Sequence, residues 1–133
     1  MGTRSLTRIK DGKKELTVMY RQFDGYLDGH GKELAEWLAN ASIVNGIRMD
    51  ENRTIFNGMG CLAASMFKHF KEEAGGIYCY PAGAKDCWEE YNYIISESPK
   101  GQIKIKVTTD KLKDILFEGT ANELLNKIEK ENK

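Results

Sequence analysis

Two β-prone segments near the start of the chain, residues 5–9 and 15–23, flank a short polar stretch that contains Asp11-Gly12. An Asp-Gly pair between two such segments is a strong signal for a tight β-hairpin, because glycine readily takes the positive φ that the turn needs. We therefore expect the chain to open with two antiparallel strands. In the second of these, Arg21 falls on the face opposite Tyr20.

The second half of the chain is expected to be mostly extended, over residues 77–80, 88–95, 103–107 and 111–118. The third of these segments, Ile-Lys-Ile-Lys-Val, alternates strictly between apolar and charged residues, which is typical of a strand with one buried face. In the second segment, Tyr91, Tyr93 and Ile95 share one face.

Apolar residues recur at helical spacing over residues 32–41 and 61–73, and again after Thr120. Thr120 and Glu123 form a capping box, which marks the start of the last helix. Residues 48–54 show no clear period and predict an exposed loop. This order favours an α+β fold, with an antiparallel sheet of about five to six strands and two or three helices packed on it. The 133 residues suit a single domain, 1–133.

Composition excludes several classes of function. Lys plus Arg and Asp plus Glu number 20 each, so the chain lacks the positive charge with which duplex nucleic acid is usually bound. No apolar run is long enough to span a bilayer, and the first residues lack the apolar region of a secretory signal. Three cysteines without a CxxC pair predict reduced thiols. We therefore expect a cytoplasmic protein.

Both early helices are preceded by glycines, in Gly29-His30-Gly31 and in Gly58-Met59-Gly60. A helix N-terminus has unpaired N–H groups and partial positive charge, and glycine lets an anion approach the backbone closely. We expect the two segments to lie close together on one side of the sheet, where they would form a shared anion site. The alternative is that these glycines only form tight turns.

Residues 20–26, with the sequence YRQFDGY, are the densest group of polar and aromatic side chains. Arg21 is suited to pairing with a phosphate or carboxylate, and an aromatic neighbour to stacking on a planar base. The alternative is a structural role, in which Arg21 pairs with a neighbouring carboxylate. The candidate ligand-binding residues are Arg21, Gln22, Phe23, Asp24, Tyr26, His30, Gly31, Asn57, Gly58 and Gly60.

Catalysis and metal binding have weaker support. His30 is the one histidine in a plausible site, and together with Asp24 and Asp28 it offers too few ligands for zinc or calcium. Lys85 could lower the pKa of the Cys87 thiol, but a cysteine nucleophile also needs a histidine that the sequence does not place. We expect no metal, no cofactor and no catalytic residue.

Four phrases resemble a family of small uncharacterised proteins of phages, prophages and large DNA viruses: MGTRSLT, MYRQFDGY, GHG and NGMGCLAA. The resemblance extends to about Ile95, and Leu27 stands where that family usually has proline. It implies a viral protein that acts in a host cytoplasm against host defence. By analogy with the sponges of Thoeris and CBASS signals, it implies a homo-oligomer that sequesters a phosphate-bearing nucleotide, such as a cyclic nucleotide or an ADP-ribose derivative. The alternatives are an inhibitor that binds a host protein and, less favoured, a nucleotide-processing enzyme.

Overall fold

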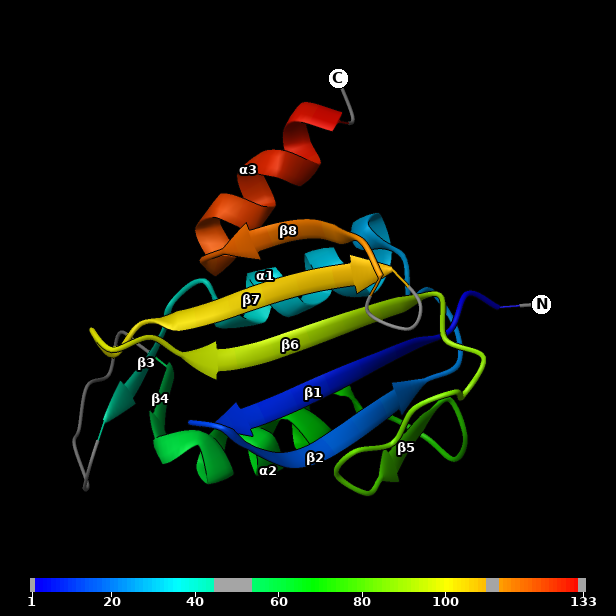
Figure 1. Ribbon diagram of the computed structural model, residues 1–133, viewed down its shortest axis with the longest axis horizontal. Coiled ribbons are helices and arrows are strands. Elements are labelled where there is room, and N and C mark those ends of the chain that lie inside the picture. The colour runs from blue at the N-terminus through cyan, green and yellow to red at the C-terminus, as the bar shows by residue number, and fades with distance from the viewer. Residues whose placement is uncertain (1, 45–53, 110–112, 132–133) are drawn as a thin grey trace.

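The computed structural model describes residues 2–44, 54–109 and 113–131, and these form an α+β fold with helices packed on a sheet (Figure 1). The main sheet has six strands in the order β5-β2-β1-β6-β7-β8, and two further strands, β3 and β4, form a small parallel sheet. The strands are β1 (Ser5–Asp11), β2 (Lys14–Arg21), β3 (Ala41–Val44), β4 (Thr54–Asn57), β5 (Ile77–Tyr80), β6 (Tyr91–Glu97), β7 (Ile103–Thr109) and β8 (Ile115–Gly119). A π-helical turn η1 (Leu27–Gly31) precedes the helices α1 (Lys32–Leu38), α2 (Gly58–Phe70) and α3 (Ala121–Glu131).

The predicted hairpin is present. Strands β1 and β2 pair antiparallel up to Asp11 and Lys14, and Gly12 in the turn has a φ of +64°. The capping box is also confirmed, because the Thr120 N–H donates to Glu123 Oε1 at 2.9 Å and the Glu123 N–H donates to Thr120 Oγ1 at 3.3 Å. Local sequence signals therefore determine the first hairpin and the start of the last helix.

One strand pair of the main sheet departs from the antiparallel arrangement. Strand β6 lies beside β1 and runs parallel to it, with Thr7 opposite Tyr93. Since β5 is an edge strand of the main sheet, the chain between β5 and β6 (residues 81–90, the crossing segment) must cross β2 and β1. Arg8 holds the crossing segment by donating from Nη2 to the Ala84 carbonyl at 2.6 Å, and its Nε donates to Asn92 Oδ1 in β6 at 3.1 Å.

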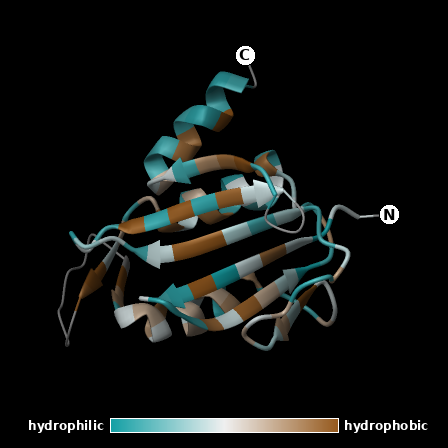
Figure 2. Cartoon of the chain, viewed as in Figure 1, coloured by the Kyte–Doolittle hydropathy of each residue, from teal (hydrophilic) through white to brown (hydrophobic). Residues whose placement is uncertain are grey.

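Helices α1 and α2 cover one face of the sheet, behind it in Figure 1, and α3 lies at the β8 edge. Strand β7 alternates visibly between apolar and polar residues (Figure 2), because every second side chain faces the helices. The sheet's contribution to the buried core is Ile9, Met19, Tyr93, Ile95, Ile103, Ile105 and Val107.

Several boundaries differ from the sequence-based expectation. Strands β3 and β4 were not predicted, and Ala41 belongs to β3 rather than to the first helix. The fourth predicted segment becomes β8, which begins at Ile115. Trp88 precedes β6 with a φ of +64° and is 84% exposed, so it does not take part in that strand. The loop expected over residues 48–54 lies outside the described residues, apart from the first position of β4. Among the described helices, none is long and apolar enough to cross a membrane.

Candidate functional site

The glycines of residues 24–31 are required by close packing. A Cβ on Gly25 would lie 2.8 Å from the Ser5 Cβ, and a Cβ on Gly29 would collide with the Asp24 carbonyl oxygen. The buried Tyr93 hydroxyl donates to the Gly25 carbonyl at 2.7 Å. Much of this glycine-rich phrase therefore serves to pack η1 against β1 and β6.

His30 is fully buried at the centre of this packing. Its Nε2 lies 2.7 Å from Thr7 Oγ1, and its Nδ1 lies 3.0 Å from Arg21 Nη1. Because a guanidinium can only donate, Nδ1 must be the acceptor and the proton must reside on Nε2, which donates to Thr7. Burial, together with the neighbouring charge of Arg21, lowers the pKa of His30 to about 3. His30 is therefore a neutral, structural imidazole.

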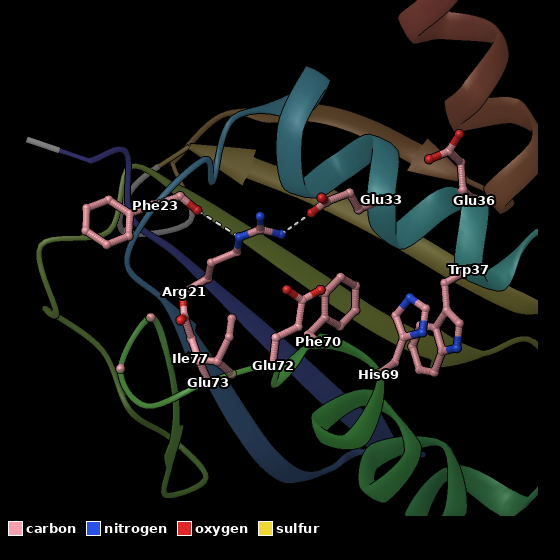
Figure 3. A pocket seen from close by; sticks show the side chains of 12 residues that line it. Arg21, Phe23, Glu33, Glu36, Trp37, His69, Phe70, Glu72, Glu73 and Ile77 are labelled. Atoms are coloured by element: carbon pink, nitrogen blue, oxygen red, sulfur yellow. Dashed lines mark hydrogen bonds and ion pairs between the residues drawn. The ribbon is translucent and has the colours of Figure 1, made fainter.

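Arg21 extends from the end of β2 toward α1 and is held at two of its nitrogens. Its Nε donates to the Phe23 carbonyl at 2.8 Å, and Nη1 donates to the carboxylate of Glu33 (Figure 3). Nη1 also donates to His30 Nδ1. Nη2 has no hydrogen-bond partner among the described residues. The Arg21 side chain is 15% exposed, whereas that of Glu33 is 50% exposed. This position confirms that Arg21 lies on the face opposite Tyr20 and reaches toward the first helix.

A cleft of about 570 Å³ opens beside Arg21. It lies between α1 and the segment in which α2 ends and leads into β5, as Figure 3 shows. The side chains of Trp37 and His69 stack nearly parallel in it, with ring centroids 5.0 Å apart and an interplanar angle of 13°. The cleft is lined by Arg21, Phe23, Glu33, Glu36, Trp37, His69, Phe70, Glu72, Glu73, Gly75, Gly76 and Ile77.

Carboxylates dominate the charge of this cleft. Glu33 and Glu36 come from α1, and Glu72 and Glu73 follow α2. Among the described residues that line the cleft, Arg21 is the one lysine or arginine. The carbonyl end of α2, which ends at Phe70, adds partial negative charge on the same side. Because Glu33 already partners Arg21, the surplus charge of the cleft is negative.

The predicted site residues of the first segment are divided between the cleft and the interior. Arg21 and Phe23 line the cleft, and Phe23 is 51% exposed. His30 and Gly31 are buried, and His30 lies directly behind Arg21. The remaining three lie outside the cleft lining: the Gln22 backbone pairs with Gly76, and the Tyr26 hydroxyl lies 3.5 Å from the carboxylate of Asp24.

The predicted shared anion site of the two glycine segments is wrong. The His30 ring packs on Phe70, with centroids 5.1 Å apart, and Phe70 is the last residue of α2. Asn57, Gly58 and Gly60 stand at the beginning of that 13-residue helix, which at 1.5 Å per residue is about 18 Å away. The two glycine segments lie on the same face of the sheet but at opposite ends, because α1 and α2 run in opposite directions.

Sequence reasoning missed most of the cleft. Trp37 falls within the predicted helix 32–41; it packs on Phe56 and Phe70, and it also lines the cleft. The sequence signal for the cleft is the spacing of its glutamates: Glu33 and Glu36 are three residues apart on one helix, and Glu72-Glu73 follows the other. Only the antiparallel packing of the two helices brings these pairs to a single cleft.

Cys87 lies on the crossing segment, away from the cleft. Its thiol donates to the Lys85 carbonyl at 3.4 Å, and partial burial with the nearby Glu89 carboxylate raises its pKa. The lowered pKa that its neighbour Lys85 suggested is therefore not found. Within the described ranges, no group of three or more potential metal ligands is present.

Comparisons of the chain with protein-family models, with curated proteins and with solved structures gave no match. The resemblance to phage and viral proteins therefore stays a prediction, and the function must be inferred from the cleft itself.

Proposed function

We propose that this protein is a binding module whose cleft receives a positively charged group, and that it acts by binding rather than by catalysis. The observation that carries this proposal is the charge of the lining. Four glutamates face a space whose single guanidinium is already paired with one of them. A cation that enters the cleft is attracted by the other three carboxylates, and a cleft with low-dielectric walls strengthens that attraction.

The aromatic lining favours a planar cation. Trp37 and His69 present a flat, stacked pair, and Phe70 lies against both rings. A guanidinium stacks on aromatic faces and pairs with carboxylates through a rigid fork of N–H groups, which an ammonium does less well. An arginine-like group therefore matches the cleft better than a small metal ion or a simple amine.

The groups suited to catalysis support binding instead. His30 is buried and neutral, and both of its ring nitrogens are engaged. Cys87, with its raised pKa, is held as a thiol on the crossing segment outside the cleft.

A phosphate-bearing nucleotide, as an immune signal to be sequestered, is the second candidate. Its support is that Arg21 and the exposed ring of Phe23 both line the cleft, where Arg21 would bind a phosphate and the Phe23 ring would stack on a base. The same four carboxylates would repel a polyanion. We therefore rank it below the cationic ligand.

Calorimetric titration separates the two candidates. The probes are N-acetyl-arginine amide, its uncharged isostere N-acetyl-citrulline amide, ADP-ribose and a cyclic dinucleotide. We expect the arginine probe to bind at least about tenfold more tightly than the citrulline probe, and less tightly in high salt because exposed charges are screened. Binding of a nucleotide without binding of the arginine probe would favour the second candidate, and binding of neither would reject both.

Glu36→Gln is the matched control for this titration. Glu36 lines the cleft on α1 and makes no ion pair among the described residues, so its loss should leave the fold intact. Removing one attractive carboxylate should weaken the arginine probe about two- to fivefold, the range of an exposed ion pair. The citrulline probe should not respond.

A further inference from the structure

We infer that the ligand of this cleft is zwitterionic: besides its cationic group it carries a carboxylate, which Arg21 binds in place of Glu33. The inference rests on the proposed function and names the ligand class, a basic amino acid or a peptide with a basic C-terminal residue. The observation behind it is that the cleft holds a positively charged arginine, Arg21, although the glutamates that line it favour a cation.

The Arg21 guanidinium is positioned before any ligand arrives. The Phe23 carbonyl holds its Nε, and Nδ1 of His30 holds its Nη1. His30 is fixed in turn by Thr7, and because it is fully buried it cannot turn away toward water. Two neutral acceptors therefore orient the guanidinium without neutralising its charge.

Glu33 is a replaceable partner for this arginine. Its side chain is half exposed, and exposed ion pairs contribute little free energy. A ligand carboxylate that reaches Nη1 and the unpartnered Nη2 would form a bidentate pair, which is geometrically better than the contact through Nη1 alone.

A carboxylate fits this position better than a phosphate. Arg21 supplies one positive charge, which matches a single carboxylate, whereas a phosphate monoester carries nearly two negative charges near neutral pH. The second charge would meet the carboxylates of the cleft without a partner among its lining residues. The acidic lining thus selects against the more highly charged anion.

The test compares N-acetyl-arginine with N-acetyl-arginine amide, which differ only in the carboxylate. We expect the acid to bind wild-type protein about tenfold more tightly, the equivalent of one charge-assisted hydrogen bond. Glu33→Gln removes the negative charge that competes for Arg21 and should raise this ratio by about a further fivefold. Glu36→Gln, the matched control on the same helix, should weaken both probes and leave the ratio unchanged.

Equal affinities of the two probes in both wild type and Glu33→Gln would overturn the zwitterion inference and leave the cation site standing. Failure of both probes to bind would reject the proposed function as well. In Arg21→Gln the acid and the amide should bind with equal affinity. Urea unfolding of this variant would be measured first, to establish that it folds. Because Arg21 is partly buried and Glu33 is not, Glu33→Gln decides the question even if Arg21→Gln fails to fold.

Discussion

His30 should make the stability of the protein depend on pH in a way that one substitution removes. Its pKa is about 3 in the folded protein and near 6.5 when unfolded. The folded pKa is depressed, so its contribution to stability is complete above pH 6.5 and is lost as the pH falls toward 3. Between pH 7.5 and pH 5 the unfolded state gains most of a proton that the folded state does not. This corresponds to about 1.5 units at 1.36 kcal/mol each, or about 2 kcal/mol.

His30→Phe keeps an aromatic ring against Phe70 and Tyr93 but cannot titrate. Urea unfolding followed by circular dichroism at pH 7.5 and pH 5 measures both proteins. The wild type should lose about 2 kcal/mol more than the variant between these two pH values. Any strain that the larger ring introduces is common to both pH values and cancels. Equal losses, within about 0.5 kcal/mol, would show that His30 is not the buried neutral group described above.

Three further substitutions test the packing. Gly25→Ala should destabilise the fold by about 1–3 kcal/mol in urea unfolding, because its methyl group would lie 2.8 Å from the Ser5 Cβ; a neutral effect would contradict the tight approach. Thr120→Ala should lower the free energy of unfolding by about 1 kcal/mol through loss of the α3 cap, whereas unchanged stability would mean that the cap is not formed in solution. Arg8→Met should lower the free energy of unfolding by about 3 kcal/mol, because it leaves the partly buried Glu15 without its cation. It should also expose the crossing segment to proteolysis, because the hydrogen bond to the Ala84 carbonyl is lost. Resistance to proteolysis equal to that of the wild type would contradict the role of Arg8 in holding this segment.

The helices and the strands of the main sheet followed from local signals, whereas the sheet order and the small sheet of β3 and β4 did not. Asp11-Gly12 and the Thr120 capping box act over a few residues, so the sequence contains all the information needed to recognise them. The parallel pairing of β1 with β6 depends on where the segment after β5 crosses the sheet, and that path is held by Arg8, which is far away in sequence. No periodicity in residues 5–9 or 88–95 distinguishes a parallel partner from an antiparallel one.

The site was predicted in part, for a similar reason. The alternation of β2 placed Arg21 on the face opposite Tyr20, and the structure agrees. The glycines around His30 suggested that a ligand could approach the backbone. In the structure the missing side chains instead let protein atoms pack closely there, and this packing buries His30. Glu36 and Glu72 are unremarkable surface residues until α1 and α2 lie antiparallel, so the acidic character of the cleft is a property of the tertiary structure alone.

The two tryptophans provide the most direct measurement of the central claim, that a cation binds between α1 and the end of α2. Trp37 lines the cleft and Trp88 lies on the exposed crossing segment, so their two indole N–H signals report on separate places. In a ¹⁵N-resolved NMR titration with N-acetyl-arginine amide, the Trp37 indole signal should shift and saturate while the Trp88 signal stays in place. A saturating shift of Trp88 with Trp37 unmoved would contradict the cleft as the binding site.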